Sequence, residues 1–173
     1  MIEMIEIRDR GVTPRGMRRQ FQKAQAEAWE DTAIQFQREH IARRFTSPTH
    51  AREAGYTKRK GDELAWGSKA WRRSYMGIKW RRFKHQRALE FTGETRAAVS
   101  GPTAANIKAT AYQATMAYPG ARKLSFRDKG SEVRMQNEFR TVTATEAGQL
   151  AKFYDRVLDR ILAANNDQTT TTI

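Results

Sequence analysis

The feature that most constrains this chain is the concentration of its positive charge in one central stretch. Residues 43–87 carry fourteen Lys or Arg residues against three acids, so this stretch accounts for +11 of the chain's net charge of +13. Like charges at this density repel one another and oppose compaction unless an anion compensates them. Nucleic acid, a membrane surface or an acidic protein would supply that anion. The plainer alternative is a solvated surface that only keeps the protein soluble.

Apolar periodicity places the folding core on either side of this stretch. Thr13 and Pro14 have the form of an N-cap followed by proline at the first helical position, and apolar residues then recur at three- and four-residue steps. This pattern predicts a long amphipathic helix over residues 14–45. Proline at position 48 predicts the end of that helix, because proline disfavours helical geometry in the residue before it.

A second amphipathic helix is predicted over residues 144–164. Thr143 and Glu146 have the spacing of a capping box, and a strong apolar stripe of helical period follows them. Residues 165–173 have little to bury and are predicted to form a flexible C-terminal tail.

Three segments with alternating apolar residues, at 2–8, 104–117 and 131–142, are predicted to be strands. We therefore expect the α+β class, with two long amphipathic helices packed on one face of a small, mostly antiparallel sheet. A long basic insertion, irregular or helical, is expected at about 46–91, with a helix at 68–87. Residues 1–164 are expected to form one domain.

The sequence contains no arrangement typical of catalysis. It has no cysteine, no glycine-rich phosphate loop, no acidic cluster suited to a metal, and no ligand-like spacing among His40, His50 and His85. We therefore expect no enzymatic activity, no cofactor and no metal. No apolar run approaches the roughly 20 residues of a membrane helix, and the N-terminus lacks the pattern of a signal peptide. We expect a protein made in a reducing cytoplasm, with no membrane partner.

Aromatic residues are interleaved with the basic ones in the central stretch. Such aromatics stack on bases while cations neutralise phosphates, but Trp, Tyr and Arg are equally typical of subunit interfaces, so both alternatives remain open. The aromatics are Tyr56, Trp66, Trp71, Tyr75, Trp80, Phe83 and Phe91. The candidate contacts to a partner or to DNA are Arg59, Lys60, Arg72, Arg73, Lys79, Arg81, Arg82 and Lys84.

The segment Leu89-Glu90-Phe91-Thr92-Gly93-Glu94-Thr95-Arg96-Ala97-Ala98-Val99 resembles a motif of tailed-bacteriophage tail-completion, or virion morphogenesis, proteins of the head–tail neck. Their motif has Leu, a spacer, Thr-Gly, a spacer, an apolar residue and Arg; here Thr95 stands in place of the apolar residue. The resemblance extends over about residues 15–163. It includes a basic, aromatic lead-in (Tyr56, Arg59, Tyr75 and Lys79) and a strand-to-helix junction (residues 138–143 with Glu146 and Leu150).

The resemblance implies a non-enzymatic structural subunit of the virion neck, of the tail-completion or tail-terminator type. Such subunits form a sixfold or twelvefold ring around the DNA channel and contact neighbouring neck, tail or portal proteins. It also implies structural roles for three residues: Thr92 and Gly93 form a turn, and Arg96 anchors the segment to a carboxylate or backbone carbonyl. The alternative is a free nucleic-acid-binding protein without sequence preference, because the same charge and aromatics serve that function.

Overall fold

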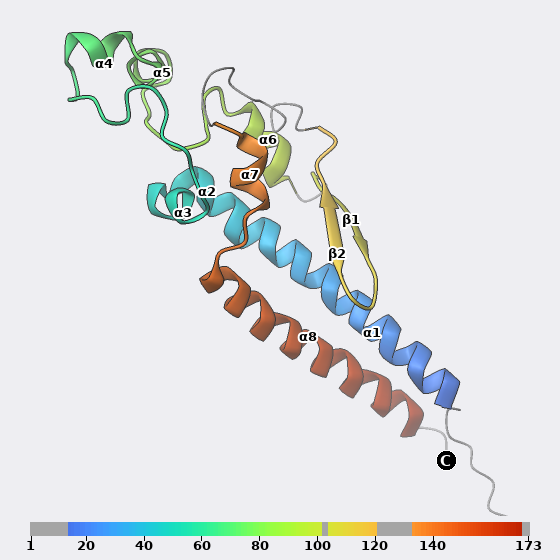
Figure 1. Ribbon diagram of the computed structural model, residues 1–173. Helices are drawn as coiled ribbons and strands as arrows, with labels where there is room; N and C mark the ends of the chain where they lie inside the picture. The colour runs from blue at the N-terminus through green and yellow to red at the C-terminus, as the bar shows by residue number, and fades with distance from the viewer. Residues whose placement is uncertain (1–13, 102–103, 121–132, 171–173) are drawn as a thin grey trace, which may run out of the picture.

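Two long helical segments run side by side through the molecule. The computed structural model describes residues 14–101, 104–120 and 133–170. The first segment is α1 (Pro14–Gln35), which continues without a break through the π-helix η1 (Phe36–Ile41) and α2 (Ala42–Thr46). The second is α8 (Ala144–Thr170), which packs along α1 (Figure 1). Trp29 and Tyr154 join them, with ring centroids 4.8 Å apart. The two long helices expected from the sequence are therefore present.

The predicted helix end before Pro48 and the predicted helix start at Thr143 both show the expected capping hydrogen bonds. Ser47 is extended, ends α2 and caps α3 (Pro48–Glu53) by accepting a hydrogen bond from the His50 N–H. Thr143 and Glu146 form the capping box: the Thr143 N–H donates to Glu146 Oε2 at 2.9 Å, and the Glu146 N–H donates to Thr143 Oγ1 at 3.2 Å. Helix α8 extends through Thr170, so it includes residues that the sequence pattern assigns to the tail.

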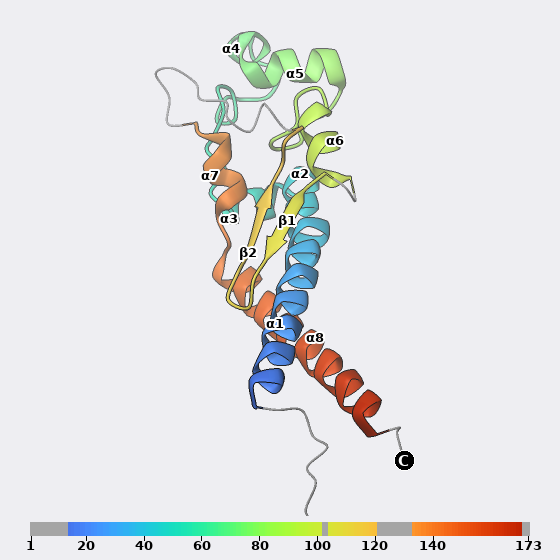
Figure 2. The same cartoon turned by 90° about the vertical axis from the view of Figure 1, so that its right-hand side faces the viewer.

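Within the described residues, the sheet is one antiparallel hairpin of β1 (Asn106–Ala109) and β2 (Ala114–Ala117), with Ile107 paired to Met116. It packs against α1, as the two views in Figures 1 and 2 show. A mostly helical chain with a small antiparallel sheet is the expected α+β class. The predicted strand at 104–117 instead contains both strands and the turn between them.

The strand predicted at 131–142 is wrong, because its described part holds the helix α7 (Met135–Arg140). The alternation that suggested a strand also places Met135 and Phe139 four residues apart, which is one face of a helix. Phe139 is buried against Phe45, with ring centroids 5.5 Å apart. Tertiary burial of that face therefore selects the helix. The strand predicted at 2–8 lies outside the described residues.

The basic insertion forms short helices and turns in place of the single helix expected at 68–87. Ser74 divides α4 (Lys69–Arg73) from α5 (Tyr75–Phe83): it is extended, and its side chain accepts a hydrogen bond from the Gly77 N–H. Gly77 permits a close approach, since a Cβ there would lie 2.7 Å from Arg72 Cα. After α5 comes α6 (Glu94–Ser100). Figure 1 shows α4 and α5 standing clear of the α1–α8 pair.

The hydrophobic core lies where η1, α2, α6 and α7 meet. Its buried side chains include Phe36, Ile41, Phe45, Val99 and Phe139. The core therefore sits at the end of the long helix pair that is nearer the basic insertion, and it anchors both ends of that insertion.

Candidate interface on the cationic lobe

The structure divides the cations of residues 43–87 into those that bond to groups of the same chain and those that are exposed without a carboxylate partner. Within the described residues, five of the fourteen pair with carboxylates: Arg43, Arg44, Lys58, Arg59 and Arg87. Four of the five carboxylates lie outside residues 43–87. They belong to Glu39, Glu90, Glu138 and Glu146. Much of the charge that looked uncompensated in the sequence is therefore neutralised by acids from other elements.

Arg44 is the most deeply buried of these cations, with a side chain that is 0% exposed. Its guanidinium donates to the carbonyl oxygens of Glu138, Phe139 and Thr141 at 2.9, 3.2 and 2.6 Å. It also donates to both carboxylate oxygens of Glu146. These carbonyls belong to the C-terminal turn of α7, where unpaired oxygens attract a cation. Arg44 thus joins α2 to α7 and to the start of α8.

Two titratable partners of this ion pair have shifted pKa values. Burial disfavours the charged form of Glu146, but the hydrogen bond from the Thr143 N–H and the Arg44 guanidinium outweigh burial and hold the Glu146 pKa below its usual value. His40 Nδ1 lies 3.7 Å from Glu146 Oε1. Burial and the neighbouring Arg43 and Arg44 nevertheless lower the His40 pKa, so this histidine is neutral at pH 7.

Arg59 is a candidate contact residue that the structure places inside the protein. Its guanidinium pairs with the buried carboxylate of Glu138 through two hydrogen bonds of 2.8 and 2.9 Å. Glu138 also accepts a hydrogen bond from the Thr57 N–H at 2.8 Å. Burial opposes the charge of Arg59, but Glu138 outweighs burial and raises the Arg59 pKa above its usual value. This pair fastens the basic insertion to α7.

Lys79 is a second candidate contact residue that faces inward. It is 1% exposed, and its ammonium donates to the carbonyl oxygen of Arg87. Burial lowers its pKa to about 8. Arg59 and Lys79 are therefore occupied by groups of the same chain, and as they stand in this structure they are not part of an exposed contact surface.

The motif of residues 89–99 forms a corner around a buried carboxylate. Glu90 Oε1 lies 3.1 Å from Arg87 Nη1, and Glu90 Oε2 lies 3.5 Å from Arg96 Nη1. Gly93 has a φ of 85°, a left-handed conformation that favours glycine, and it precedes the first residue of α6. Thr92 is exposed, and its hydroxyl accepts a hydrogen bond from the Glu94 N–H. Arg96 thus lies beside a carboxylate and Gly93 lies in a turn.

His85 completes the set of groups around Glu90. Its Nε2 lies 3.8 Å from Glu90 Oε1, while burial and the cations Lys79 and Arg87 lower its pKa. Burial and the cationic surroundings therefore disfavour protonation of His85.

Apart from Arg52, which is exposed and lies outside it, the remaining cations form one exposed set on the cationic lobe, which we define as residues 57–87. Within the described residues these side chains are exposed and pair with no carboxylate. One of them, Arg81, donates from Nη2 to the Arg72 carbonyl at 3.1 Å. The set comprises Lys60, Lys69, Arg72, Arg73, Arg81, Arg82 and Lys84. Six of the eight candidate contact residues therefore lie on this surface, and Lys69 joins them.

The aromatic residues of the insertion are divided in the same way. Tyr75 and Phe83 pack on Phe91, with centroid distances of 5.3 and 5.0 Å, and Trp71 is only 6% exposed. Trp66 is the exception, since it is 66% exposed. Its ring contacts Trp71 and Trp80, with centroids 5.6 and 6.3 Å away. The lobe therefore exposes one large aromatic side chain, that of Trp66, in addition to its cations.

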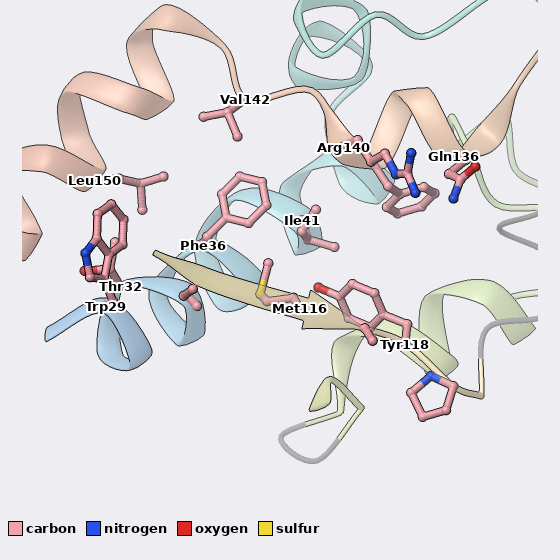
Figure 3. A pocket seen from close by; sticks show the side chains of 15 residues that line it. Trp29, Thr32, Phe36, Ile41, Met116, Tyr118, Gln136, Arg140, Val142 and Leu150 are labelled. Carbon is pink, nitrogen blue, oxygen red and sulfur yellow. The ribbon is translucent and has the colours of Figure 1, made fainter. Parts of the chain in front are cut away.

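An apolar cavity of about 660 Å³ lies at a distance from this lobe, between α1, η1, β2, α7 and α8. Figure 3 shows Trp29, Phe36, Met116 and Leu150 among its lining residues. The hydroxyl of Tyr118 is buried there and has no hydrogen-bond partner among the described residues. Burial raises the pKa of Tyr118 to about 12. The lining also includes the polar side chains of Thr32, Gln136 and Arg140.

The described residues hold no group of three or more His, Asp or Glu side chains placed to bind a metal ion. None of the described helices combines the length and the apolar composition needed to cross a bilayer. No protein-family model matches the chain, and no curated protein or solved structure shows significant similarity to it.

Sequence reasoning missed the buried ion pairs that hold the insertion in place. The partners Arg44 and Glu146, and Arg59 and Glu138, are 102 and 79 residues apart in the chain. No local pattern links residues at such separations. Acids and bases are balanced around the capping box, so composition there gave no signal either.

Proposed function

We propose that this chain is a non-enzymatic structural subunit of the head–tail neck of a tailed bacteriophage, of the tail-completion or tail-terminator type. The observation that carries the proposal is the segment 89–99, which resembles the neck-protein motif. Its geometry supports a structural role, because Leu89 and Val99 are buried in the core while Glu90 collects Arg87 and Arg96. The buried motif side chains thus contribute to holding the fold.

The proposed subunit assembles into a ring of six or twelve copies around the DNA channel and contacts neighbouring neck, tail or portal proteins. It is made in the host cytoplasm and ends in the virion. An exposed apolar surface supports subunit contacts: Met17 and Phe21 are one helical turn apart on α1 and are 61% and 44% exposed. Burying such side chains against a neighbour would stabilise the assembly.

The mass of the purified protein in solution tests the proposal. Sedimentation equilibrium and native mass spectrometry should give a closed oligomer, or a monomer that assembles when the neighbouring neck protein is added. The double variant Met17→Glu/Phe21→Glu should remain folded and lose assembly, because it places charges in the contact. The control Arg15→Glu/Arg19→Glu changes charge on exposed positions of the same helix without removing apolar surface.

Incorporation into particles provides the decisive readout. Purified virions should contain the protein at the neck, and a phage that lacks its gene should accumulate separate heads and tails. A protein that stays monomeric with every neck component and is missing from purified particles would disprove the proposed role.

A further inference from the structure

We propose that the cationic lobe binds single-stranded nucleic acid, with Trp66 stacking on a base while the exposed Lys and Arg side chains contact phosphates. This function goes beyond a structural role in a neck and does not depend on it. The inference rests on what the folded chain leaves unpaired on the lobe.

The first argument comes from charge. The fold pairs Arg44, Arg59 and Arg87 with carboxylates, yet the seven exposed cations of the lobe have no carboxylate partner within the described residues. A second copy of this chain is a poor source of compensation, because outside residues 43–87 the chain is nearly balanced, with a net charge of +2. The compensating anion is therefore a different molecule, and a polyphosphate chain supplies charges at regular spacing.

The second argument comes from the aromatic residues. An exposed indole contributes nothing to a surface that binds only phosphate. Burying Trp66 within the fold would lower the free energy of the folded state. Instead, Trp66 is 66% exposed while its ring contacts Trp71 at an interplanar angle of 47° and Trp80 edge-on at 76°. Bases stack on such exposed rings without regard to sequence, because every base has a π-face.

The third argument comes from proximity. Arg72 and Arg73 directly follow Trp71 in the chain, and Arg81 directly follows Trp80. The hydrogen bond from Arg81 to the Arg72 carbonyl brings the end of α5 against the end of α4. Arginines, whose guanidinium groups suit phosphate binding, thus directly follow two of the three clustered tryptophans. A single strand that stacks on Trp66 would bring its adjacent phosphates toward these positions, whereas a duplex keeps its base faces inside.

Fluorescence anisotropy with a labelled single strand about 20 nucleotides long tests the charge component, since one such strand covers a single binding site. DNA and RNA strands form two arms of the experiment. In the variant Arg72→Gln/Arg73→Gln/Arg82→Gln, the slope of log K against log salt should fall by about 2, at about 0.7 per lost phosphate contact. The matched control Arg15→Gln/Arg18→Gln/Arg19→Gln removes the same charge from exposed positions of α1 and should leave the slope nearly unchanged.

The variant Trp66→Leu tests the stacking component. It should weaken binding about tenfold at constant salt, which lies within the range measured for loss of one stacked base. Trp66→Phe keeps an aromatic face and should recover most of the affinity. Circular dichroism and thermal unfolding of each variant report whether the lobe is intact, and Trp66→Phe remains informative if Trp66→Leu disturbs the neighbouring tryptophans.

Three outcomes would overturn the inference. Equal loss of binding in the lobe variant and the α1 control would show that net charge alone drives association. Full affinity in both Trp66 variants would exclude stacking and leave a surface recognised by charge, as expected for an acidic protein partner. Equal or tighter binding to a blunt duplex of the same sequence would also exclude it. None of these results bears on incorporation into virions, so the proposed neck role stands or falls separately.

Discussion

Arg44 Nη2 lies 2.7 Å from Glu146 Oε2 and 3.0 Å from Glu146 Oε1, and both side chains are almost completely buried. The same carboxylate also closes the capping box of α8 through the Thr143 N–H. Glu146 therefore both caps the start of α8 and neutralises a buried cation. Loss of either charge would leave the other unpaired in the interior, which is more costly than the pair itself is stabilising.

Arg44→Met should lower the free energy of unfolding by about 3–5 kcal/mol, because it leaves Glu146 and three carbonyl oxygens without their donor. The adjacent residue provides a control of the same type: Arg43 pairs with Glu39 at 2.9 Å on the surface. Arg43→Met should change stability by no more than about 0.5 kcal/mol, since exposed pairs contribute little. Urea unfolding of both variants checks the prediction. Similar losses in the two would contradict it.

Stability should fall as the pH drops below the usual pKa of histidine. His40 has a lowered pKa in the folded protein, so between its folded pKa and 6.5 the unfolded chain binds the additional proton. Glu146 also has a lowered pKa, so its contribution is present above 4.5 and is lost as the pH falls through its folded value.

His40→Gln isolates the histidine part of this dependence. The variant should lose less stability than the parent chain between about pH 6.5 and pH 5, because glutamine does not titrate. Urea midpoints measured in half-unit steps of pH give the comparison. Parallel curves for the two proteins over this interval would show that another group is responsible.

Two glycines should respond in opposite directions to alanine. Gly93→Ala should destabilise the protein by about 1–2 kcal/mol, because an L side chain is strained at its φ of 85°. Gly148→Ala should stabilise it by about 0.5–1 kcal/mol, since that glycine lies within α8 and a Cβ there would meet no atom within 4 Å. Thermal unfolding of both variants tests the pair. A stabilising Gly93→Ala would contradict the left-handed turn.

Tyr118→Phe should stabilise the protein by about 1 kcal/mol at neutral pH, because it removes a buried hydroxyl that has no partner among the described residues. The variant should also change how the free energy of unfolding depends on pH above about pH 10. Tyr118 keeps its proton to about pH 12 in the folded state, whereas a tyrosine in the unfolded chain ionises near 10. Stability is therefore lost as the pH rises between these values, and the variant should lose less. An unfolding midpoint below that of the parent would indicate a hidden hydrogen bond.

The two long helices, the capping box and the helix end before Pro48 could all be predicted from the sequence. Each depends on residues within one or two turns of one another, so periodicity and spacing carry the information. The strand predicted at 131–142 was wrong because a contact between residues far apart in the chain, and no local pattern, decides the structure there. Met135 and Phe139 fit both a strand and a helix locally, and burial of Phe139 against Phe45 decided between them.

The sequence by itself determined how much positive charge the central stretch carries, which aromatics accompany it and where the two long helices lie. Only the tertiary structure decided which charges are available to a partner. Arg59 and Lys79 look no different in sequence from Arg72 or Arg82, yet Arg59 is half-buried against Glu138 and Lys79 is buried, while the last two are exposed. The reason is that pairing and burial depend on distances between residues far apart in the chain, and these distances exist only once the chain has folded.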